Sequence, residues 1–433
     1  MDLQNIFTEA LQLHTQGRLE EAKERYRLVL QELPENVNVL GNIGIVCRDL
    51  AQWDDALQYC RRAVDAAPDD PMQHINLGAV YQDSGMPDEA LKCYEKALIL
   101  APSHPKALNN LGKLYHLQGR PLKALAYFEK AVSVEPDYPL ALNNIGVLLS
   151  ERGDISEAVR YLEKSYSLDP YNSETLYNLA GLYNCLHEKE KAVKLLEMLV
   201  ALSPEHPSAQ HMLAALKGKT TERAPVEYVV ETFNSYAGRF DSHLQATLQY
   251  NVPAALARML KEVRTEGCFQ ACLDLGCGTG LSGEACRPLC HALTGVDLSP
   301  GMLARAQEKS IYDRIECKDV FTFLQYETAQ YDLFLAMDLL IYIGELEGFF
   351  AGLQKQAAQE AIAALSIERC DGPEEYTLRE SGRYAHTVHY VEKTAQKYGF
   401  AMLRREDHGI RKENNSWIPG HLLLFSFNGG ACR

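Results

Sequence analysis

The chain has 433 residues and a net charge of −15, with 46% hydrophobic and 23% charged residues. This length exceeds the usual size of one domain and the composition is globular, so two domains, or a repeat array with a domain, are expected. The negative charge argues against nucleic acid as a partner, because phosphate binding relies on Lys and Arg.

Neither a leader nor a membrane segment is expected. Residues 1–17 show no basic stretch followed by an apolar core. No apolar run approaches the roughly 20 residues that cross a bilayer. The twelve cysteines lack the paired spacing of zinc sites, so we interpret them as reduced and predict no metal site. These features indicate a cytoplasmic protein without membrane contact, and they leave the oligomeric state open.

The first half repeats every 34 residues. Small residues recur where two helices of a hairpin approach closely, and proline follows because it cannot continue a helix. The repeated positions are Ala22, Ala56, Ala90, Ala124, Ala158 and Ala192, then Pro34, Pro68, Pro102, Pro136, Pro170 and Pro204. A period of this length predicts a stack of helical hairpins.

One unit contains Leu77-Gly78-x-x-Tyr81, followed by Ala90-x-x-x-Tyr94, Ala97 and Pro102. This pattern resembles the tetratricopeptide repeat, and the resemblance covers about six units over residues 1–217. It implies an α-solenoid of helical hairpins that serves as an interaction surface. The last unit departs from the pattern, as expected of a terminal repeat.

An asparagine also recurs every 34 residues, on the first helix of each unit: Asn42, Asn76, Asn110, Asn144 and Asn178. This series resembles the asparagine ladder of O-GlcNAc transferase, which holds extended peptides on the concave face of its repeats. A side-chain amide has donors and an acceptor for a peptide bond. The resemblance therefore implies a peptide or protein partner. The alternative is that these amides bond within the repeats.

Residues 218–226 are polar, break the repeat and predict a linker. Residues 227–265 follow with aromatic residues at helical spacing, Phe233, Tyr236 and Phe240, and with a helix over 254–263. These aromatic residues either pack between helices or cover a ligand.

From residue 266 to residue 433, strand-like and helical runs alternate, which predicts a parallel sheet covered on both faces. The run Leu273–Leu275 breaks into a loop with glycines at 276, 278 and 280, and a helix should begin just after it. A loop of this kind lets backbone approach a nucleotide-like ligand closely.

The next strands end in acids. The second, over 292–297, ends at Asp297, and an acid about 20 residues after such a loop can bind ribose hydroxyls. The third ends at Asp319, the fourth covers 331–336, and the last covers 422–427. We expect a helix over 354–364 that runs nearly into the fifth strand, Ala364–Glu368.

The loop Asp274-x-Gly276-x-Gly278-x-Gly280, together with Asp297 and Asp319, resembles class I S-adenosylmethionine-dependent methyltransferases, which have a Rossmann-like α/β fold. Glycine spacing of this kind differs from the dehydrogenase fingerprint. The resemblance implies an S-adenosylmethionine site formed by Tyr236, Asp274, Gly276, Gly278, Gly280, Asp297, Leu298, Met302, Asp319, Val320 and Met337.

Asp338-x-x-x-Tyr342 and Gly382-Arg383-Tyr384-x-His386 are similar to sequences in methyltransferases that carry tetratricopeptide repeats. Asp338 is a candidate to orient the acceptor or take a proton, and its alternative is a helix N-cap. His386 is a candidate base. Tyr342, Arg383, Tyr384 and His389 are candidate acceptor contacts, and each histidine alone could equally be a packing or surface residue.

Three functions remain open at this point. The first is methylation of a peptide or protein held by the repeats, with a carboxylate oxygen or a side-chain nitrogen as acceptor. The second is methylation of a small metabolite, with the repeats used for assembly. The third is a scaffold that binds cofactor without turnover.

Overall fold

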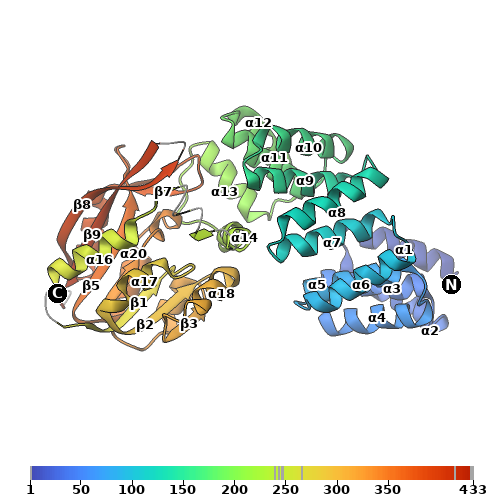
Figure 1. The fold of residues 1–433 in the computed structure, drawn as a ribbon, viewed down its shortest axis with the longest axis horizontal. Helices are drawn as coiled ribbons and strands as arrows, with labels where there is room; N and C mark the ends of the chain where they lie inside the picture. The colour runs from blue at the N-terminus through green and yellow to red at the C-terminus, as the bar shows by residue number, and fades with distance from the viewer. Residues whose placement is uncertain are drawn as a thin grey trace. The chain divides into compact units, whose positions relative to one another are not determined.

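A computed structural model describes residues 2–237, 240–241, 244, 248–264, 267–413 and 416–429. The chain divides into two compact units, Met1–Leu186 and His187–Arg433 (Figure 1). Among the described residues, no helix combines the length and the apolar character needed to cross a membrane. The predicted boundary at residue 217 rests on the repeat pattern, whereas this division follows compactness, so α12 and α13 belong to the second unit.

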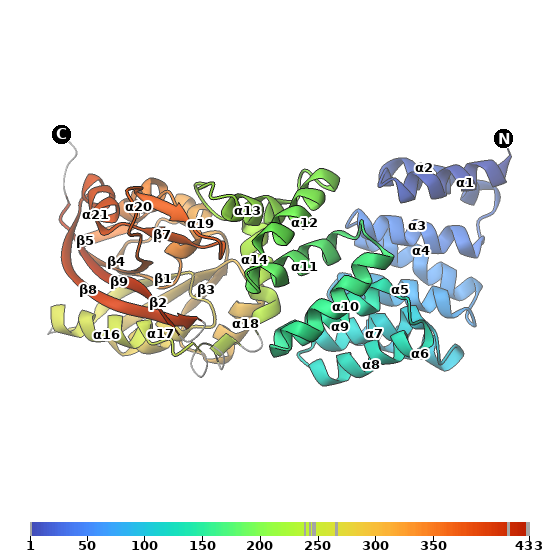
Figure 2. The same cartoon turned by 90° about the horizontal axis from the view of Figure 1, so that it is seen from above.

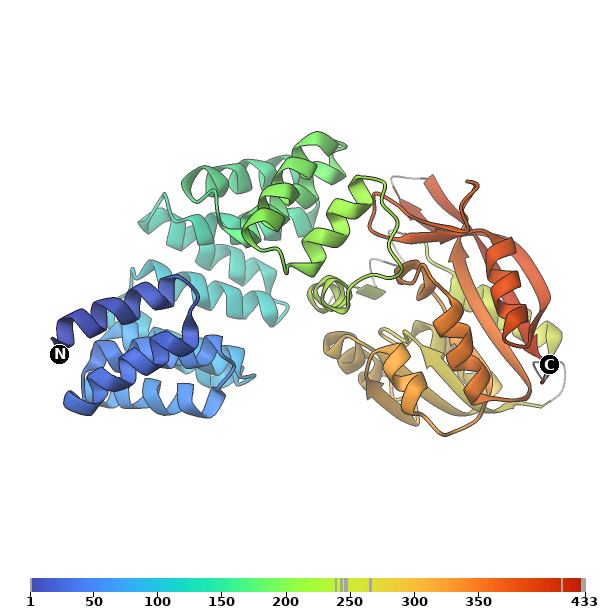
Figure 3. The ribbon, with the colours of Figure 1, turned by 180° about the vertical axis from the view of Figure 1, so that it is seen from behind.

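The first unit consists of helices in consecutive hairpins (Figure 3). They are α1 (Leu3–Thr15), α2 (Leu19–Glu32), α3 (Val37–Asp49), α4 (Trp53–Ala66), α5 (Pro71–Asp83), α6 (Pro87–Leu100), α7 (Pro105–Leu117), α8 (Pro121–Val134), α9 (Pro139–Arg152), α10 (Ile155–Leu168) and α11 (Ser173–Cys185).

Two conformational requirements explain the repeated residues. The turn inside a hairpin needs positive φ, which Gly85 adopts at +80°, and Ala51 at the same place is held at φ 55°. The helices of a hairpin also touch closely: a Cβ on Gly78 would lie 2.6 Å from the Tyr94 ring. Glycine at position 78 is therefore required by packing.

The first helices of successive hairpins contact one another, α3 with α5, α5 with α7, α7 with α9 and α9 with α11. Packing of these helices along the array places them on the inner side of the superhelical curve. The asparagine series lies on these helices.

The second unit begins with α12 (Lys189–Leu202), α13 (Pro207–Leu216), α14 (Val226–Tyr236) and α16 (Val252–Val263). The sheet region then follows: β1 (Phe269–Leu275), α17 (Leu281–Cys286), η1 (Arg287–Leu289), β2 (Cys290–Asp297), α18 (Pro300–Glu308), β3 (Arg314–Cys317), α19 (Val320–Tyr326), β4 (Tyr331–Ala336), η2 (Leu340–Tyr342), α20 (Glu347–Gln356), β5 (Ala357–Glu368), β6 (Tyr376–Leu378), β7 (Tyr384–His386), α21 (Val388–Lys397), β8 (Phe400–Glu413) and β9 (Ser416–Phe427).

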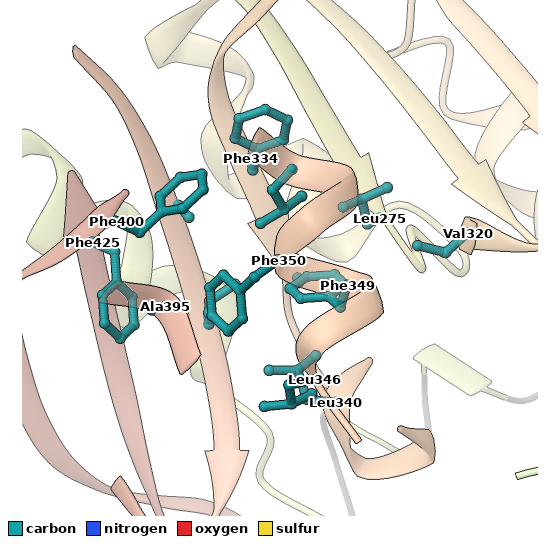
Figure 4. Close-up of a cluster of buried hydrophobic side chains, with 14 of the residues drawn as sticks. Leu275, Val320, Phe334, Leu340, Leu346, Phe349, Phe350, Ala395, Phe400 and Phe425 are labelled. Atoms are coloured by element: carbon teal, nitrogen blue, oxygen red, sulfur yellow. The ribbon is translucent and has the colours of Figure 1, made fainter. Parts of the chain in front are cut away.

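The main sheet has the strand order β3-β2-β1-β4-β5-β9-β8, in which β9 runs antiparallel to both neighbours. Helices α20 and α21 lie on one face and α16 and α17 on the other (Figure 2). In the first of these two layers, the Phe350 ring centroid lies 5.9 Å from that of Phe400 and 6.1 Å from that of Phe425 (Figure 4).

The prediction of a helix over residues 354–364 is wrong. Helix α20 ends at Gln356 and β5 begins at Ala357, where it pairs with β4 on one side and further on with β9 on the other. The register moves from the pair Tyr331–Ala357 to Leu333–Ile362, so β5 bulges between these pairs. Sheet pairing on both sides overrides the helical preference of this alanine-rich stretch.

Helices α13 and α14 both pack against the small β6–β7 sheet. The buried His211 side chain hydrogen-bonds to the Gly382 carbonyl at 2.9 Å, and its ring centroid lies 4.7 Å from that of Tyr228. The hydroxyls of Thr221 and Tyr384 share a hydrogen bond of 2.5 Å. The last repeat helix is therefore fixed to the turn that precedes Arg383.

Candidate functional site

A cavity of about 400 Å³ lies at the carboxyl ends of the parallel strands of the second unit. Residues that follow β1, β2, β3 and β4 line it, together with α14 and the segment up to Pro253. The strand order turns from β2 on one side of β1 to β4 on the other, and ligands of open α/β sheets bind at such a switch point.

The glycine loop forms the floor of this cavity near β1. Gly276, Gly278 and Gly280 adopt φ of 68°, 54° and 90°, a region that side chains disfavour. A Cβ on Gly278 would meet no atom within 4 Å, whereas one on Gly276 would lie 3.0 Å from Leu339. Space for a ligand is therefore open above Gly278.

Asp297 ends β2 at the cavity wall. One carboxylate oxygen accepts from the Gly278 N–H and the other from the Ser299 N–H, both at 2.8 Å. Burial raises the pKa of Asp297, and these backbone donors oppose the rise. The residue thus ties the glycine loop to the turn before α18, and its carboxylate lies where the sequence predicts a ribose contact.

Asp319 also lines the cavity, and it is the N-cap of α19. One of its oxygens accepts from the Thr322 N–H at 3.0 Å and from the Thr322 hydroxyl at 3.2 Å. The other predicted contacts of this part of the site that line the cavity are Leu298, Met302, Val320 and Met337.

Aromatic residues of α14 and the following segment cover the cavity. The Tyr236 and Phe233 ring centroids lie 5.2 Å and 5.9 Å from that of Phe240, and Phe233 lies 5.5 Å from Tyr342. Tyr236, which the sequence predicted as a contact, lines the cavity with them. The ligand site is therefore walled by rings on this side.

Two polar residues fasten this aromatic cover to the sheet, and sequence reasoning missed both. The Asn234 amide oxygen accepts from the Ser299 hydroxyl at 2.7 Å and from the Gly301 N–H at 3.3 Å. Asp241 accepts from the Thr279 hydroxyl and pairs with Lys309 at 2.8 Å. Nothing in the local pattern distinguishes these residues from surface polar residues.

A charged cluster lines the opposite side of the cavity, toward β5 and β8. Arg411 is 3% exposed and donates from Nε to Glu413 at 3.0 Å, from Nη1 to Asp338 at 3.2 Å, and from Nη2 to Glu368. Arg383 donates to Glu413, and Arg379 donates to Glu368 at 2.9 Å. Burial alone would lower the pKa of Arg411, but the three carboxylates raise it.

The geometry of β8 explains why Arg411 and Glu413 reach the site. Strand β5 ends at Glu368, which pairs with Gly420, whereas β8 and β9 continue to the pair Glu413–Ser416. A register shift between Gly409 and Lys412 redirects the end of β8, as bulges commonly do beside sites. The sequence shows only alternating charges here, which indicate a surface strand.

Asp338 follows β4 and lines the same cavity. Its backbone has φ 57°, and its N–H donates to the Ser366 hydroxyl at 2.8 Å. It is not a helix N-cap, because η2 is preceded by Leu339. Burial raises the pKa of Asp338, while Arg411 lowers it. Backbone strain of this kind concentrates at functional sites.

The structure places Tyr342 and Arg383 at the cavity but not the remaining acceptor candidates. His386 is fully buried in β7, where its Nε2 contacts the Gly344 carbonyl at 3.1 Å and its ring stacks on Tyr390. Burial lowers its pKa to about 4. The role of His386 as a base is therefore wrong, because the ring serves the core.

The prediction that Tyr384 and His389 contact the acceptor is contradicted in the same way. Tyr384 is fully buried and points its hydroxyl to Thr221, while His389 is exposed on α21, and neither lines the cavity. Tyr384 begins the short strand β7 and His389 lies in the first turn of α21, so neither reaches the cavity that Arg383 lines. Proximity in the sequence did not predict proximity in space.

Asp274 and Gly280 belong to the glycine motif but also lie outside the cavity lining. Asp274 is fully buried and accepts from the Ser282 and Tyr312 hydroxyls, each at 2.7 Å. A Cβ on Gly280 would lie 3.1 Å from Ile311 and Tyr312. These residues shape the loop and begin α17, and their contact with a ligand stays a prediction.

The asparagine series is partly engaged within the array. Asn144 Nδ2 donates to Asn109 Oδ1 at 2.8 Å, and Asn178 Nδ2 donates to Asn143 Oδ1 at 3.2 Å. These bonds join neighbouring repeats, which favours a structural role for Asn144 and Asn178. Asn42 and Asn110 are half-buried and Asn76 is buried.

Comparisons with known proteins give the same two parts. Models of the tetratricopeptide repeat match residues 13–77, 70–136, 118–173 and 149–216. A model of the methyltransferase domain matches residues 273–364. No curated protein gives a significant match.

Several solved structures are similar to this chain over part of its length. MamA is 25% identical, over 37% of this chain and 94% of its own, with a TM-score of 0.31. YrrB, described as a TPR protein with an unusual peptide-binding site, is 23% identical over 43% and 96%, with a TM-score of 0.30. An S-adenosylmethionine-dependent methyltransferase from Clostridium acetobutylicum is 18% identical over 46% and 100%, with a TM-score of 0.36.

The chain therefore combines a tetratricopeptide-repeat solenoid with a class I methyltransferase domain. Such a domain implies S-adenosylmethionine, and the residues present fit this cofactor. Backbone without side chains faces open space at Gly278, and Asp297 and Asp319 follow the adjacent strands. The cavity volume is also within the range of small-molecule sites.

Proposed function

We propose that this protein is an S-adenosylmethionine-dependent methyltransferase that modifies a peptide or protein held on the inner side of its repeats. One observation carries the catalytic part of the proposal. A single cavity joins the glycine loop and Asp297 on one side of the switch point to Asp338 and its arginines on the other. Separate ends of one cavity suit a methyl donor and an acceptor.

Alignment of donor and acceptor is the main task of such a site, because methyl transfer from a sulfonium is an in-line displacement. Positioning can supply up to about 7–11 kcal/mol of the barrier. The aromatic cover and the glycine loop would hold the donor, which supplies the methyl group. Asp338 and Tyr342 would orient the acceptor. A cytoplasmic location is also part of this proposal.

Cofactor binding is tested by calorimetry with S-adenosylhomocysteine on the full chain. Asp297→Asn removes the charge and leaves one amide oxygen for the two backbone donors now held by the carboxylate. A charge-assisted contact of about 1.5–3 kcal/mol corresponds to roughly 10- to 150-fold weaker binding. Asp371→Asn, on an exposed residue, is the matched control. Equal affinity in the Asp297 variant would reject the site.

Peptide capture is tested by a double variant, Asn76→Ala with Asn110→Ala, measured as KM for a polypeptide acceptor. Two lost amide contacts of about 0.5–1.5 kcal/mol each should raise KM by roughly 5- to 150-fold without changing kcat. Asn5→Ala, on an exposed residue of α1, is the control. An unchanged KM would assign the series to repeat stability alone.

The acceptor class is decided by transfer of labelled methyl from S-adenosylmethionine into fractionated cell extract. Label in polypeptide supports the proposal. Label only in small molecules supports a metabolite methyltransferase whose repeats serve assembly. Cofactor binding without transfer of any label supports a non-catalytic scaffold.

A further inference from the structure

The arginines of the charged cluster are ion-paired with acidic residues of the protein. Each of the three nitrogens of the Arg411 guanidinium donates one hydrogen bond to a carboxylate. Arg383 donates through Nη2 to Glu413, and its Nε lies 3.6 Å from Glu368. Both arginines at this end are therefore ion-paired with acidic residues of the protein, and of the two only Arg383 has a buried nitrogen, Nε, without a hydrogen-bond partner among the described residues.

One carboxylate oxygen at this end lacks a donor. Asp338 Oδ2 accepts from Arg411, but Oδ1 is buried and has no hydrogen-bond partner among the described residues. An unsatisfied buried acceptor is costly, so a ligand group that donates a hydrogen bond there is favoured. A carboxylate ligand would instead place a second negative group beside Asp338.

The charges of the cluster balance without a ligand. Asp338, Glu368 and Glu413 face Arg379, Arg383 and Arg411. Tyr250 and Tyr342 line the cavity beside this cluster, and the faces of aromatic rings attract cations. A positively charged donor group thus finds an unpartnered acceptor at Asp338, whereas an anion would lie beside carboxylates whose partners are already the arginines of the cluster.

We infer that the methyl acceptor is the nitrogen of an amine, bound as a cation through Asp338. This inference rests on the proposed function and narrows its acceptor from carboxylate oxygen or nitrogen to nitrogen. The ammonium group gives one proton to Asp338. The lone pair of the neutral nitrogen then forms the C–N bond as the C–S bond of S-adenosylmethionine breaks. The C–S electron pair remains on sulfur, and the products are a methylammonium and a thioether.

The binding test uses n-butylammonium and butyrate as probes, titrated into the full chain saturated with S-adenosylhomocysteine. We expect n-butylammonium to bind at millimolar concentration or below and butyrate to bind at least 10-fold more weakly. Asp338→Asn should weaken n-butylammonium binding by at least 10-fold while S-adenosylhomocysteine affinity stays within 2-fold. Asp371→Asn is the control and should change neither. These thresholds correspond to about 1.4 kcal/mol per factor of ten.

Three results would each overturn the inference. They are no binding of n-butylammonium, tighter binding of butyrate than of n-butylammonium, and an unchanged n-butylammonium affinity in Asp338→Asn. A second measurement treats the product of labelled methyl transfer into extract with base. Label that stays on the product supports an amine, and label released as methanol identifies an ester and overturns it. Since S-adenosylhomocysteine affinity is measured in separate titrations of each variant, failure of the amine assignment is distinguished from failure of the methyltransferase site.

Discussion

Replacement of Arg411 by Met is expected to destabilise the second unit more than any surface substitution on the same strand. Arg411 and Glu368 are 3% and 2% exposed in their side chains, and the guanidinium joins three carboxylates at the cavity. Methionine fills a similar volume without charge. The change therefore leaves Glu368 and Asp338 in place with one partner fewer each.

The magnitude follows from burial. Removing one partner of a buried ion pair costs about 3–5 kcal/mol. Glu368 keeps Arg379 at 2.9 Å, so the lower end of this range, about 3 kcal/mol, applies. At about 2–4 °C per kcal/mol for a unit of this size, the midpoint should fall by roughly 6–12 °C. Combining Arg411→Met with Glu368→Gln should recover roughly 0.5–3 kcal/mol, because the uncompensated charge is removed.

The assay is thermal unfolding of the full chain, following the transition that S-adenosylhomocysteine raises. Arg405→Met is the matched control, because Arg405 lies on the same strand and pairs with Asp407 at the surface. It should change stability by less than about 1 kcal/mol. If Arg411→Met and Arg405→Met lower the midpoint equally, the cluster is not the stabilising element inferred here.

Three further outcomes are expected. Gly382→Ala should destabilise by about 1–2 kcal/mol or more, because φ is +77° and the Cβ would lie 2.5 Å from the Tyr228 hydroxyl; Gly218→Ala, with φ +66° and open space, should show the backbone cost alone. His386→Gln should keep kcat and its pH profile within a few-fold, whereas loss of a true base costs about 100-fold or more. Burial raises the pKa of Asp274 to about 6 from 3.8, so the unfolded state releases this proton first and stability falls as pH rises from about 4 to 6. In Asp274→Asn this fall is absent, and the stability of the variant relative to the parent should improve by roughly 2 kcal/mol between pH 4 and pH 7 in denaturant titrations.

Local rules made much of the fold predictable. The 34-residue period predicted the hairpins, since close packing at Gly78 and positive φ at Gly85 each demand a particular residue. The strand at Tyr331–Ala336 was predicted with its correct bounds. The fifth strand was not, because its alanine-rich start has no strand signal until β4 and β9 pair with it.

The candidate site divides in the same way. Gly276, Gly278, Asp297, Asp319 and Asp338 could be predicted, because each lies directly after a strand or within a turn that local chemistry fixes. Arg411 and Glu413 could not, because each reaches the cavity through packing of distant segments. Asp241 could not either, because its contact is with Thr279, which is 38 residues away in the sequence. His386 was misjudged for the converse reason: burial removes it from the cavity.

The sequence by itself determined the repeat architecture, because the 34-residue period sets the helical hairpins. It also determined the glycine loop and the acidic residues of the expected donor site, because these lie at the ends of single strands. The tertiary structure alone decided the charged end of the cavity, where we propose that the acceptor binds. Extension of β8 beyond β5 brings Arg411 to Asp338, and the β6–β7 sheet brings Arg383 beside them. These contacts depend on strand register and sheet order, which are properties of long-range pairing rather than of any local pattern.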